Sequence, residues 1–345
     1  MEPQPLAYLG RAFLESEEAR PLRILAEYLG PLRRFKAQNI QDTVVFFGSA
    51  RIHSPEMAQK ALEKLSRKRE HEEYDEMLRR GRKAVDWSRY YVESRELARM
   101  LTHWSMTLDT VHHRFVVCSG GGPGIMEAAN RGASEAGGKT IGLNIKLPFE
   151  QGPNRYITQG LHFEFHYFFM RKFWFAYLAK ALVIFPGGFG TLDEMFEILT
   201  LMQTDKLAKQ IQIILYGTEY WDRILQLEPM EEWGAIGSHD RDLLQRADTP
   251  RQAFDCLKAH LTEHHITPPV AQEMRAPGIA KTRSRQEIEG QVTEATERTV
   301  PHRETKKRSH SEKNLRRSAS ISDPLSLCVD ASPPSPLSRP FPRAQ

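Results

Sequence analysis

The residues best suited to chemistry lie close together in one stretch of the chain, residues 185–194, which reads FPGGFGTLDE. The stretch combines a glycine-rich turn with a hydroxyl group, Thr191, and a carboxylate, Glu194. A turn without side chains lets backbone N–H groups approach an anion, and the positive end of a following helix attracts the same charge. The spacing therefore predicts a phosphate site with a carboxylate one turn into a helix.

The same spacing also has a purely structural interpretation. Thr191 and Glu194 form a T-x-x-E capping box, in which the threonine caps the helix and the glutamate reaches back to its backbone. Local spacing alone does not decide between capping and phosphate binding, so the choice depends on other motifs in the chain.

A second glycine-rich turn, SGGGPG at residues 119–124, follows the apolar run 114–118. A helical pattern starts at Ile125, Gly137-Gly138 ends it, and residues 139–147 resume as a strand. Such a strand–helix–strand unit predicts a parallel sheet with a right-handed crossover. The third glycine of a G-x-G-x-x-G motif would fall on Ile125, so a dinucleotide site is disfavoured, whereas a mononucleotide phosphate site stays open.

A pair of cations, Arg171-Lys172, interrupts the aromatic and aliphatic stretch 165–185. One interpretation is a helix whose basic side chains extend to solvent. The other is a substrate-binding pair, because the two residues precede the turn at 186–191 by one helix length. The residues alone leave both interpretations open.

Together these motifs resemble the LONELY GUY (LOG) family of nucleotide phosphoribohydrolases, once widely mislabelled as lysine decarboxylases. The family pattern P-G-G-x-G-T-x-x-E is matched in full by residues 186–194, and residues 120–126 approximate its G-G-G-x-x-G-[IL]-M element. Arg171-Lys172 after a methionine and Gly48-Ser49 after an opening strand also fit, so the resemblance covers about residues 41–225. The chain departs from shorter members at Glu127, and in a long insertion after the first strand that resembles the larger bacterial branch.

The resemblance implies hydrolysis of the N-glycosidic bond of a nucleoside 5′-monophosphate to free base and ribose 5-phosphate, with AMP or an N6-modified AMP such as a cytokinin riboside monophosphate as substrate. Glu194 and Arg171 are the expected catalytic residues, and no cofactor or metal is expected. A homodimer or higher homo-oligomer is implied as well, with the aromatic segment 163–177 at the contact. The expected substrate-binding residues are Gly48, Ser49, Gly121, Gly122, Gly124, Met170, Lys172, Gly187, Gly188, Gly190 and Thr191.

Other classes of protein fit parts of this pattern. A non-catalytic nucleotide or molybdenum-cofactor carrier of the same fold could use the phosphate turns, but it has no need of Glu194 paired with Arg171. A regulatory protein could use the nucleotide site as a sensor. A pyridoxal-phosphate decarboxylase needs a lysine beside a matched acid, and nothing marks Lys172, Lys180 or Lys206 for that role. His162, Glu164 and His166 alternate, so on a strand they would share one face and could bind a metal ion. A polar edge strand, or contact with substrate near Arg171, is favoured over a metal site.

Charge is unevenly distributed along the 345 residues. Residues 271–345 contain 14 Lys+Arg and 9 Asp+Glu, so they account for the net charge of +4. This segment is rich in Ser, Pro and Arg and has one aromatic residue, so we expect a disordered tail with solvated charges in preference to a nucleic-acid site. Three scattered cysteines argue against a disulfide framework, and neither a secretory signal nor a membrane span is indicated; we expect a cytoplasmic protein.

The elements that must position the site follow from apolar patterning. We expect an α/β, Rossmann-like, doubly wound and mainly parallel sheet. Three parts are predicted: a helical N-terminal extension over 1–40, the catalytic domain over 41–268 with an insertion at about 57–112, and the tail over 269–345. The predicted elements are strands at 43–47, 181–185 and 211–216; a leucine-faced helix broken at Gly30-Pro31; a helix capped by Ser54; a charged helix or hairpin over 57–83 with a second helix near 90–101; and helices at 221–227 and 249–261.

Overall fold

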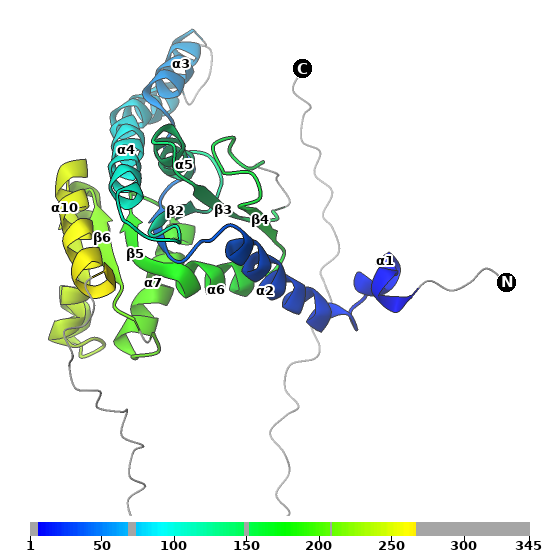
Figure 1. Ribbon diagram of the computed structural model, residues 1–345. Helices are drawn as coiled ribbons and strands as arrows, with labels where there is room; N and C mark the ends of the chain where they lie inside the picture. Colours follow the sequence, from blue (N-terminus) through cyan, green and yellow to red (C-terminus); the bar gives the residue numbers. More distant parts are fainter. Residues whose placement is uncertain (1–5, 68–73, 148–151, 208, 267–345) are drawn as a thin grey trace, which may run out of the picture. The chain divides into compact units, whose positions relative to one another are not determined.

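The computed structural model describes residues 6–67, 74–147, 152–207 and 209–266, all within one unit, Met1–Met274. Its centre is a seven-stranded sheet in the order β4-β3-β2-β1-β5-β6-β7, and every neighbouring pair is parallel (Figure 1). The predicted α/β class is confirmed. The strands are β1 (Thr43–Phe47), β2 (Val116–Ser119), β3 (Thr140–Ile145), β4 (His162–Phe165), β5 (Ala179–Ile184), β6 (Gln212–Tyr216) and β7 (Leu244–Ala247).

The first strand lies at the centre of the sheet and divides the chain into two halves. β2, β3 and β4 follow on one side of β1, and the chain then returns to place β5, β6 and β7 on the other side. The strand order therefore reverses between β1 and β5, where Val45 of β1 is opposite Leu182 of β5. In open α/β sheets ligands bind at the carboxyl ends of the strands beside such a reversal.

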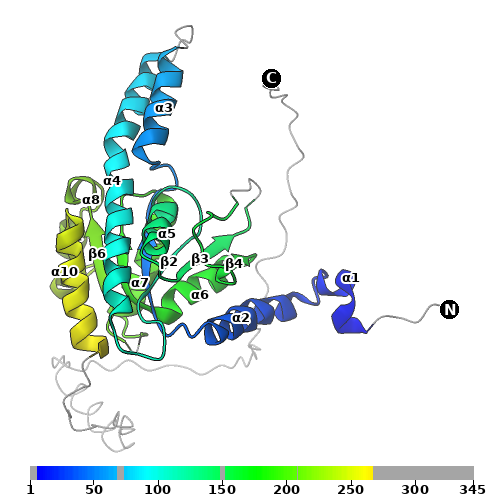
Figure 2. The ribbon, with the colours of Figure 1, turned by 45° about the horizontal axis from the view of Figure 1, so that its top comes forward.

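Helices cover both faces of the sheet, as the doubly wound prediction requires. One face packs against α2 (Arg20–Ala37), α6 (Phe168–Leu178) and α7 (Phe189–Gln203), and the other against α4 (Tyr74–Met106), α5 (Ile125–Glu135) and α10 (Pro250–Leu261) (Figures 1 and 2). Strand side chains alternate between the two layers: Val45 joins the first core and Val44 the second. Both faces are buried, which explains why the strands read as continuous apolar runs.

The predicted insertion forms a helical hairpin. Its first arm is α3 (Pro55–Ser66), where the Ser54 hydroxyl accepts a hydrogen bond from the Met57 N–H and Pro55 takes the first helical position, as predicted. Its second arm is α4, which continues without interruption from the charged segment into Tyr90 and Leu101. The predicted separate second helix is therefore part of α4, whose later turns are buried on the sheet.

The predicted break at Gly30-Pro31 is wrong, because α2 continues through Pro31. Proline cannot supply the N–H that would normally bond to the carbonyl four residues earlier. The indole N–H of Trp174 on α6 donates to that oxygen, on Glu27, at 2.9 Å. The helix is thus completed by a residue far away in the sequence.

The predicted leucine stripe of α2 is not its buried face. Leu22, Leu25 and Leu29 are 47–50% exposed, whereas Tyr28 and Phe35 lie against the core with their neighbours Ile24 and Leu32. The Glu27 carboxylate accepts hydrogen bonds from the N–H groups of His166 and Tyr167, at the start of α6. This anchor turns the leucines toward solvent.

The remaining described elements are short. β4, which carries His162 and Glu164, is an edge strand of the sheet, as the alternation of its polar residues indicated. No helix among the described residues is long and apolar enough to cross a membrane, and the predicted tail, 269–345, lies outside them. The short helices not yet given are η1 (Ala7–Leu9), α1 (Arg11–Leu14), α8 (Thr218–Ile224), α9 (Glu228–Glu232), η2 (Ser238–Leu243) and η3 (Thr262–Ile266).

Candidate active site

Three loops meet at the carboxyl edge of the sheet where the strand order reverses. The Ser49 N–H donates to Pro186 O at 3.0 Å, which joins the loop after β1 to the loop after β5. The Ile125 N–H donates to Ser49 O at 3.2 Å, which adds the loop after β2. Backbone hydrogen bonds thus bring together all three sequence motifs.

Glycine is required where these loops touch. A Cβ on Gly48 would lie 2.7 Å from the Ile125 side chain, and one on Gly124 would lie 2.5 Å from Ser49 O. Gly124 also has a φ of +70°, a conformation that L side chains rarely adopt. Two of the predicted substrate-binding glycines therefore have a packing reason to be glycine.

The helix after the glycine turn at residues 186–190, α7, starts earlier than a capping box would place it. Gly188 is the N-cap of α7 and makes no side-chain cap, so Thr191 lies inside the first turn and the capping interpretation is wrong. The Leu192 N–H makes the first helical bond, to Gly188 O, and the preceding N–H groups are those that a helix leaves unpaired. The Thr191 hydroxyl lies against Gly187, where a Cβ would approach it to 2.2 Å. A hydroxyl and free N–H groups therefore line this turn.

Arg171 and Glu194 form a shielded ion pair near the starts of α6 and α7. Arg171 Nη2 donates to Glu194 Oε1 at 2.9 Å, and each side chain is only 12% exposed. The Nε of Arg171 is buried and has no hydrogen-bond partner among the described residues. A buried donor without a protein partner is unusual, and a bound water or ligand at this carboxyl edge would complete its hydrogen bonding.

Burial dominates the protonation of Glu194. Desolvation raises the pKa of Glu194 to about 7; Arg171 opposes this shift, whereas the neighbouring Asp193 reinforces it. Protonated and ionised forms are therefore both populated near neutral pH. Such a poised carboxyl group is typical of general acids and bases.

The second glycine turn lies against this pair. A Cβ on Gly120 would be 4.0 Å from Arg171 Nη1, and the Arg171 guanidinium also lies 5.6 Å from the ring centres of Phe168 and Phe175. Cys118 of β2 is 2% exposed, and burial together with the charge of Glu194 raises its pKa. The ends of β2 and β5 thus share one environment.

Lys172 and Met170 are placed differently from Arg171. Lys172 Nζ contacts Asp193 at 2.8 Å and Glu197 at 3.2 Å, so its charge is already engaged by carboxylates of α7. Met170 is 8% exposed and belongs to the core below α6. In this arrangement Lys172 joins α6 to α7 and Met170 packs in the core, which leaves Arg171 as the cation beside the turns.

Two asparagines that the sequence did not single out lie against the second glycine turn, and one of them bonds to it. Asn154 Nδ2 donates to Gly121 O at 3.0 Å and to Gly122 O at 3.1 Å. Asn144 lies at the end of β3, 8% exposed, and its Oδ1 has no partner among the described residues. A Cβ on Gly121 would lie 2.0 Å from that oxygen. An amide in an otherwise apolar strand, here residues 140–145, was the signal that could have identified Asn144.

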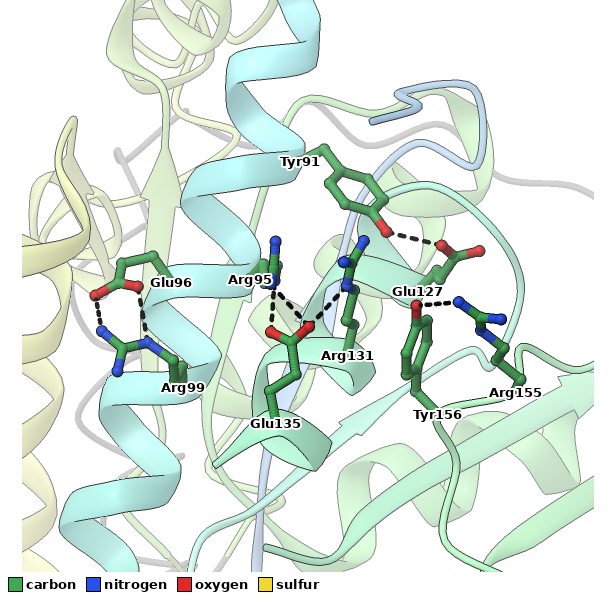
Figure 3. Close-up of polar contacts among 9 residues, drawn as sticks. All are labelled: Tyr91, Arg95, Glu96, Arg99, Glu127, Arg131, Glu135, Arg155 and Tyr156. Carbon is green, nitrogen blue, oxygen red and sulfur yellow. Dashed lines mark hydrogen bonds and ion pairs between the residues drawn. The ribbon is translucent and has the colours of Figure 1, made fainter. Parts of the chain in front are cut away.

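Figure 3 shows how α4 supports the helix that follows this turn. Tyr91 of α4 donates to Glu127 of α5 at 2.7 Å, and Arg95 of α4 pairs with Glu135 at 2.6 Å. Glu127 and the long insertion were the two departures from the shorter family members. The structure shows that they belong together, because the partner of Glu127 comes from the inserted helix.

Comparisons with known proteins confirm the family resemblance. The model of the family described as "Possible lysine decarboxylase" matches residues 126–257. The chain is 28% identical over 149 residues to the probable cytokinin riboside 5′-monophosphate phosphoribohydrolase LOG6 of Arabidopsis thaliana, a match that covers 43% of this chain and 74% of that protein. It is 25% identical over 158 residues to the cytokinin riboside 5′-monophosphate phosphoribohydrolase LOG of Oryza sativa subsp. japonica, with coverage of 44% and 62%.

Solved structures with a similar chain path include two proteins described as molybdenum-cofactor binders. The binding protein from Rippkaea orientalis is 19% identical with a TM-score of 0.36, over 50% of this chain and 88% of that one. The carrier protein from Chlamydomonas reinhardtii is 18% identical with a TM-score of 0.36, over 64% and 99%. At these values the likeness concerns the path of the backbone and not the ligand.

Proposed function

We propose that the protein hydrolyses the N-glycosidic bond of a nucleoside 5′-monophosphate, with AMP or an N6-modified AMP such as a cytokinin riboside monophosphate as substrate. The observation that carries this proposal is the shielded Arg171–Glu194 pair beside two glycine turns at the reversal of strand order. A protein that only binds phosphate has no need of a buried carboxyl group there. The names of the curated relatives agree with this reaction.

The 5′-phosphate would bind at the start of α7. The N–H groups of Gly188, Gly190 and Thr191 and the Thr191 hydroxyl supply donors, and the helix dipole favours an anion. Ser49 and Gly124, held together by backbone contacts, would line the opposite side. The ribose would then lie over the Arg171–Glu194 pair.

Cleavage of an N-glycoside builds positive charge on the ribose ring, as in O-glycoside hydrolysis. The Glu194 carboxylate would stabilise that charge and orient or activate the water that attacks C1′. The free Nε of Arg171 would donate to the departing base or to the phosphate. The bond between C1′ and the base nitrogen breaks, and water supplies the hydroxyl of ribose 5-phosphate and the proton of the base.

The decarboxylase description of the family is not supported by the lysines of this chain. Lys172, nearest to the site, is engaged by Asp193 and Glu197. Burial lowers the pKa of Lys209 to about 8, but its Nζ donates to the Ala176 and Tyr177 carbonyls at the far end of α6. Neither amine is placed to form a Schiff base beside the glycine turns.

The direct test is incubation of the purified full-length protein with AMP, GMP, CMP, UMP and isopentenyl-AMP, with free base and ribose 5-phosphate measured by chromatography. We expect release of base from AMP or isopentenyl-AMP, and at least a 100-fold loss in Glu194→Gln, the loss typical of a removed acid–base group. Lys258→Glu, at an exposed position on α10, is the control variant and should keep the wild-type activity. Tight nucleotide or molybdenum-cofactor binding without release from any nucleotide would favour a carrier instead.

We also propose that the protein is a homo-oligomer in which a second copy covers the apolar face of α2 and α6. Phe168, Phe169 and Tyr177 of α6 are 48–51% exposed, and a groove of about 610 Å³, lined by Leu25 and Phe169, runs between α2 and α6. Contiguous exposed aromatic patches mark protein interfaces, and symmetric pairing buries one such patch on both copies. The charged tail, with Phe341 as its one aromatic residue, is poorly suited to cover this face.

Sedimentation or light scattering tests this interface. Phe169→Glu and Leu25→Glu should each shift the protein toward monomer, because a charge would be buried in the contact. Met57→Glu, at a 55% exposed position on α3, should leave the molar mass unchanged. A monomeric wild-type protein would refute the proposal.

A further inference from the structure

A second concavity lies on the carboxyl edge of the sheet, one strand further along than the candidate active site. It has a volume of about 260 Å³ and is walled by the first half of α4 and by α8. Because α8 begins directly after β6, the concavity lies at the carboxyl end of that strand, and carboxyl edges of this kind are where α/β sheets bind ligands. The Arg171–Glu194 pair is not part of its lining.

Two aromatic rings form one wall of this concavity. Trp87 of α4 and Tyr220 of α8 meet edge to face with ring centres 5.4 Å apart. The Tyr220 hydroxyl donates to Gly187 O at 2.6 Å, so the wall is bonded directly to the glycine turn after β5. Aromatic faces beside a wet polar rim suit a planar heterocycle.

The charges around the rings suit an amino-bearing nucleotide. Lys83 and Arg223 make no ion pair among the described residues, although Lys83 Nζ lies 5.8 Å from the centre of the Trp87 ring, whereas Arg89 is paired with Glu219 at 3.1 Å. Two unpaired cations offer charge-assisted hydrogen bonds to a phosphate. Asp86 also makes no ion pair among the described residues, so its carboxylate is available to accept from an exocyclic amine.

We propose that this concavity is a second nucleotide site, specific for a nucleoside monophosphate whose base carries an amino group. The base lies against Trp87 and Tyr220, Asp86 accepts from the amino group, and Lys83 and Arg223 bind the phosphate. The volume lies just below the roughly 300 Å³ at which small-molecule sites begin, which suits a mononucleotide with one end in solvent and excludes a dinucleotide. Through Tyr220, an occupant is one hydrogen bond from the catalytic turn.

Calorimetric titration of AMP into the full-length Glu194→Gln protein tests the second site, because that background prevents turnover. Two binding events per chain are expected. The double variant Lys83→Glu/Arg223→Glu should lose one event, with at least a tenfold loss of affinity, and Arg171→Ala should weaken the other. Lys60→Glu/Lys258→Glu makes the same change in net charge at exposed positions of α3 and α10 and should keep both events. Quenching of Trp87 fluorescence, identified by its absence in Trp87→Phe, should follow the event that Lys83→Glu/Arg223→Glu removes.

The outcomes separate this site from the candidate active site. A single event that depends on Arg171 and ignores the charge reversal would refute the second site and leave the proposed function intact. A single event that depends only on Lys83 and Arg223 would support the second site and count against nucleotide binding at Arg171. Equal affinity for AMP and UMP at the second site, or no AMP binding, would refute the proposal, because uracil lacks the amino group.

Discussion

The indole N–H of Trp174 on α6 donates to the one carbonyl oxygen that Pro31 leaves without a helical partner, that of Glu27 on α2. Trp174 and Glu27 lie 147 positions apart, and their hydrogen bond lets a proline occupy the middle of a helix. This contact holds α2 against α6, at whose first turns Arg171 is placed.

Trp174→Phe should therefore destabilise the protein through one unsatisfied buried carbonyl, by about 1–3 kcal/mol in addition to lost packing. In a Pro31→Ala background the restored backbone N–H can donate to the same oxygen. The loss on Trp174→Phe should then be smaller by about 1 kcal/mol, measured by denaturant unfolding of all four proteins as a double-mutant cycle. Strictly additive effects would show that the Glu27 carbonyl does not depend on the indole.

The same contact shows where prediction from sequence ends. Strands such as 43–47 and the cap at Ser54 depend on their own residues and immediate neighbours, and both were predicted. The continuation of α2 through Pro31 depends on a donor supplied by α6, which local pattern does not reveal. Likewise, the leucine pattern of α2 does not reveal which face packs on the core. The hydrogen bonds of Glu27 to the start of α6 place the partly buried Tyr28 on that face and leave Leu22, Leu25 and Leu29 exposed.

The sequence motifs of the candidate site could be predicted, but the residues that hold these motifs in place could not. The glycine turns, Arg171 and Glu194 carry recognisable spacing, so their proximity follows once the sheet is parallel. The start of α7 at Phe189 excluded the capping box, and the T-x-x-E spacing alone could not exclude it. Asn144 and Asn154 were missed because isolated asparagines in a strand or loop have no characteristic spacing.

The stability of the protein should depend on the protonation of Glu194. Its pKa is raised to about 7 in the fold, whereas an unfolded glutamate titrates near its ordinary value of about 4.5. The folded state therefore keeps a proton that the unfolded state releases, and this contribution is fully present below about pH 4.5 and lost as pH rises to about 7. Relative to wild type, Glu194→Gln should gain up to about 3 kcal/mol across that window, since one pKa unit is worth about 1.4 kcal/mol. Parallel unfolding curves at pH 4.5 and pH 7.5 are the measurement, and an unchanged difference between the two proteins would refute a raised pKa.

The same group should set the pH dependence of turnover. If the ionised carboxylate stabilises the ribose cation, kcat/KM for AMP should rise as pH increases through about 7. The Asp193 charge raises the pKa of Glu194, so Asp193→Asn should move the midpoint to lower pH. The substitution also frees Lys172 from its ion pair with Asp193, and the positive charge of Lys172 likewise lowers the pKa of Glu194. A profile that falls above pH 7 would instead assign Glu194 the role of proton donor.

The contact between Tyr91 and Glu127 should stabilise α5 against the inserted helix. Tyr91→Phe removes the donor to a half-buried carboxylate and should lower the free energy of unfolding by about 1 kcal/mol. Combined with Glu127→Ala, the loss should be less than additive. Tyr8→Phe, at a 68% exposed position far from both helices in the sequence, is the matched control and should have no effect. Since neither residue contacts the Arg171–Glu194 pair, kcat should change by less than about threefold, and a larger change would place Glu127 in the substrate site.

Two glycines separate the roles of packing and phosphate binding in the turns. A Cβ at Gly124 meets Ser49 O at 2.5 Å with φ at +70°, so Gly124→Ala should lower the free energy of unfolding by at least about 2 kcal/mol. A Cβ at Gly190 meets nothing within 4 Å, and alanine is favoured over glycine in a helix, so Gly190→Ala should leave stability equal or about 0.5–1 kcal/mol higher. If the start of α7 binds the 5′-phosphate, the added methyl group should nevertheless raise KM for AMP at least tenfold. A stable Gly190→Ala protein with unchanged KM would move the phosphate away from this turn, whereas the predicted split between stability and KM would place it there.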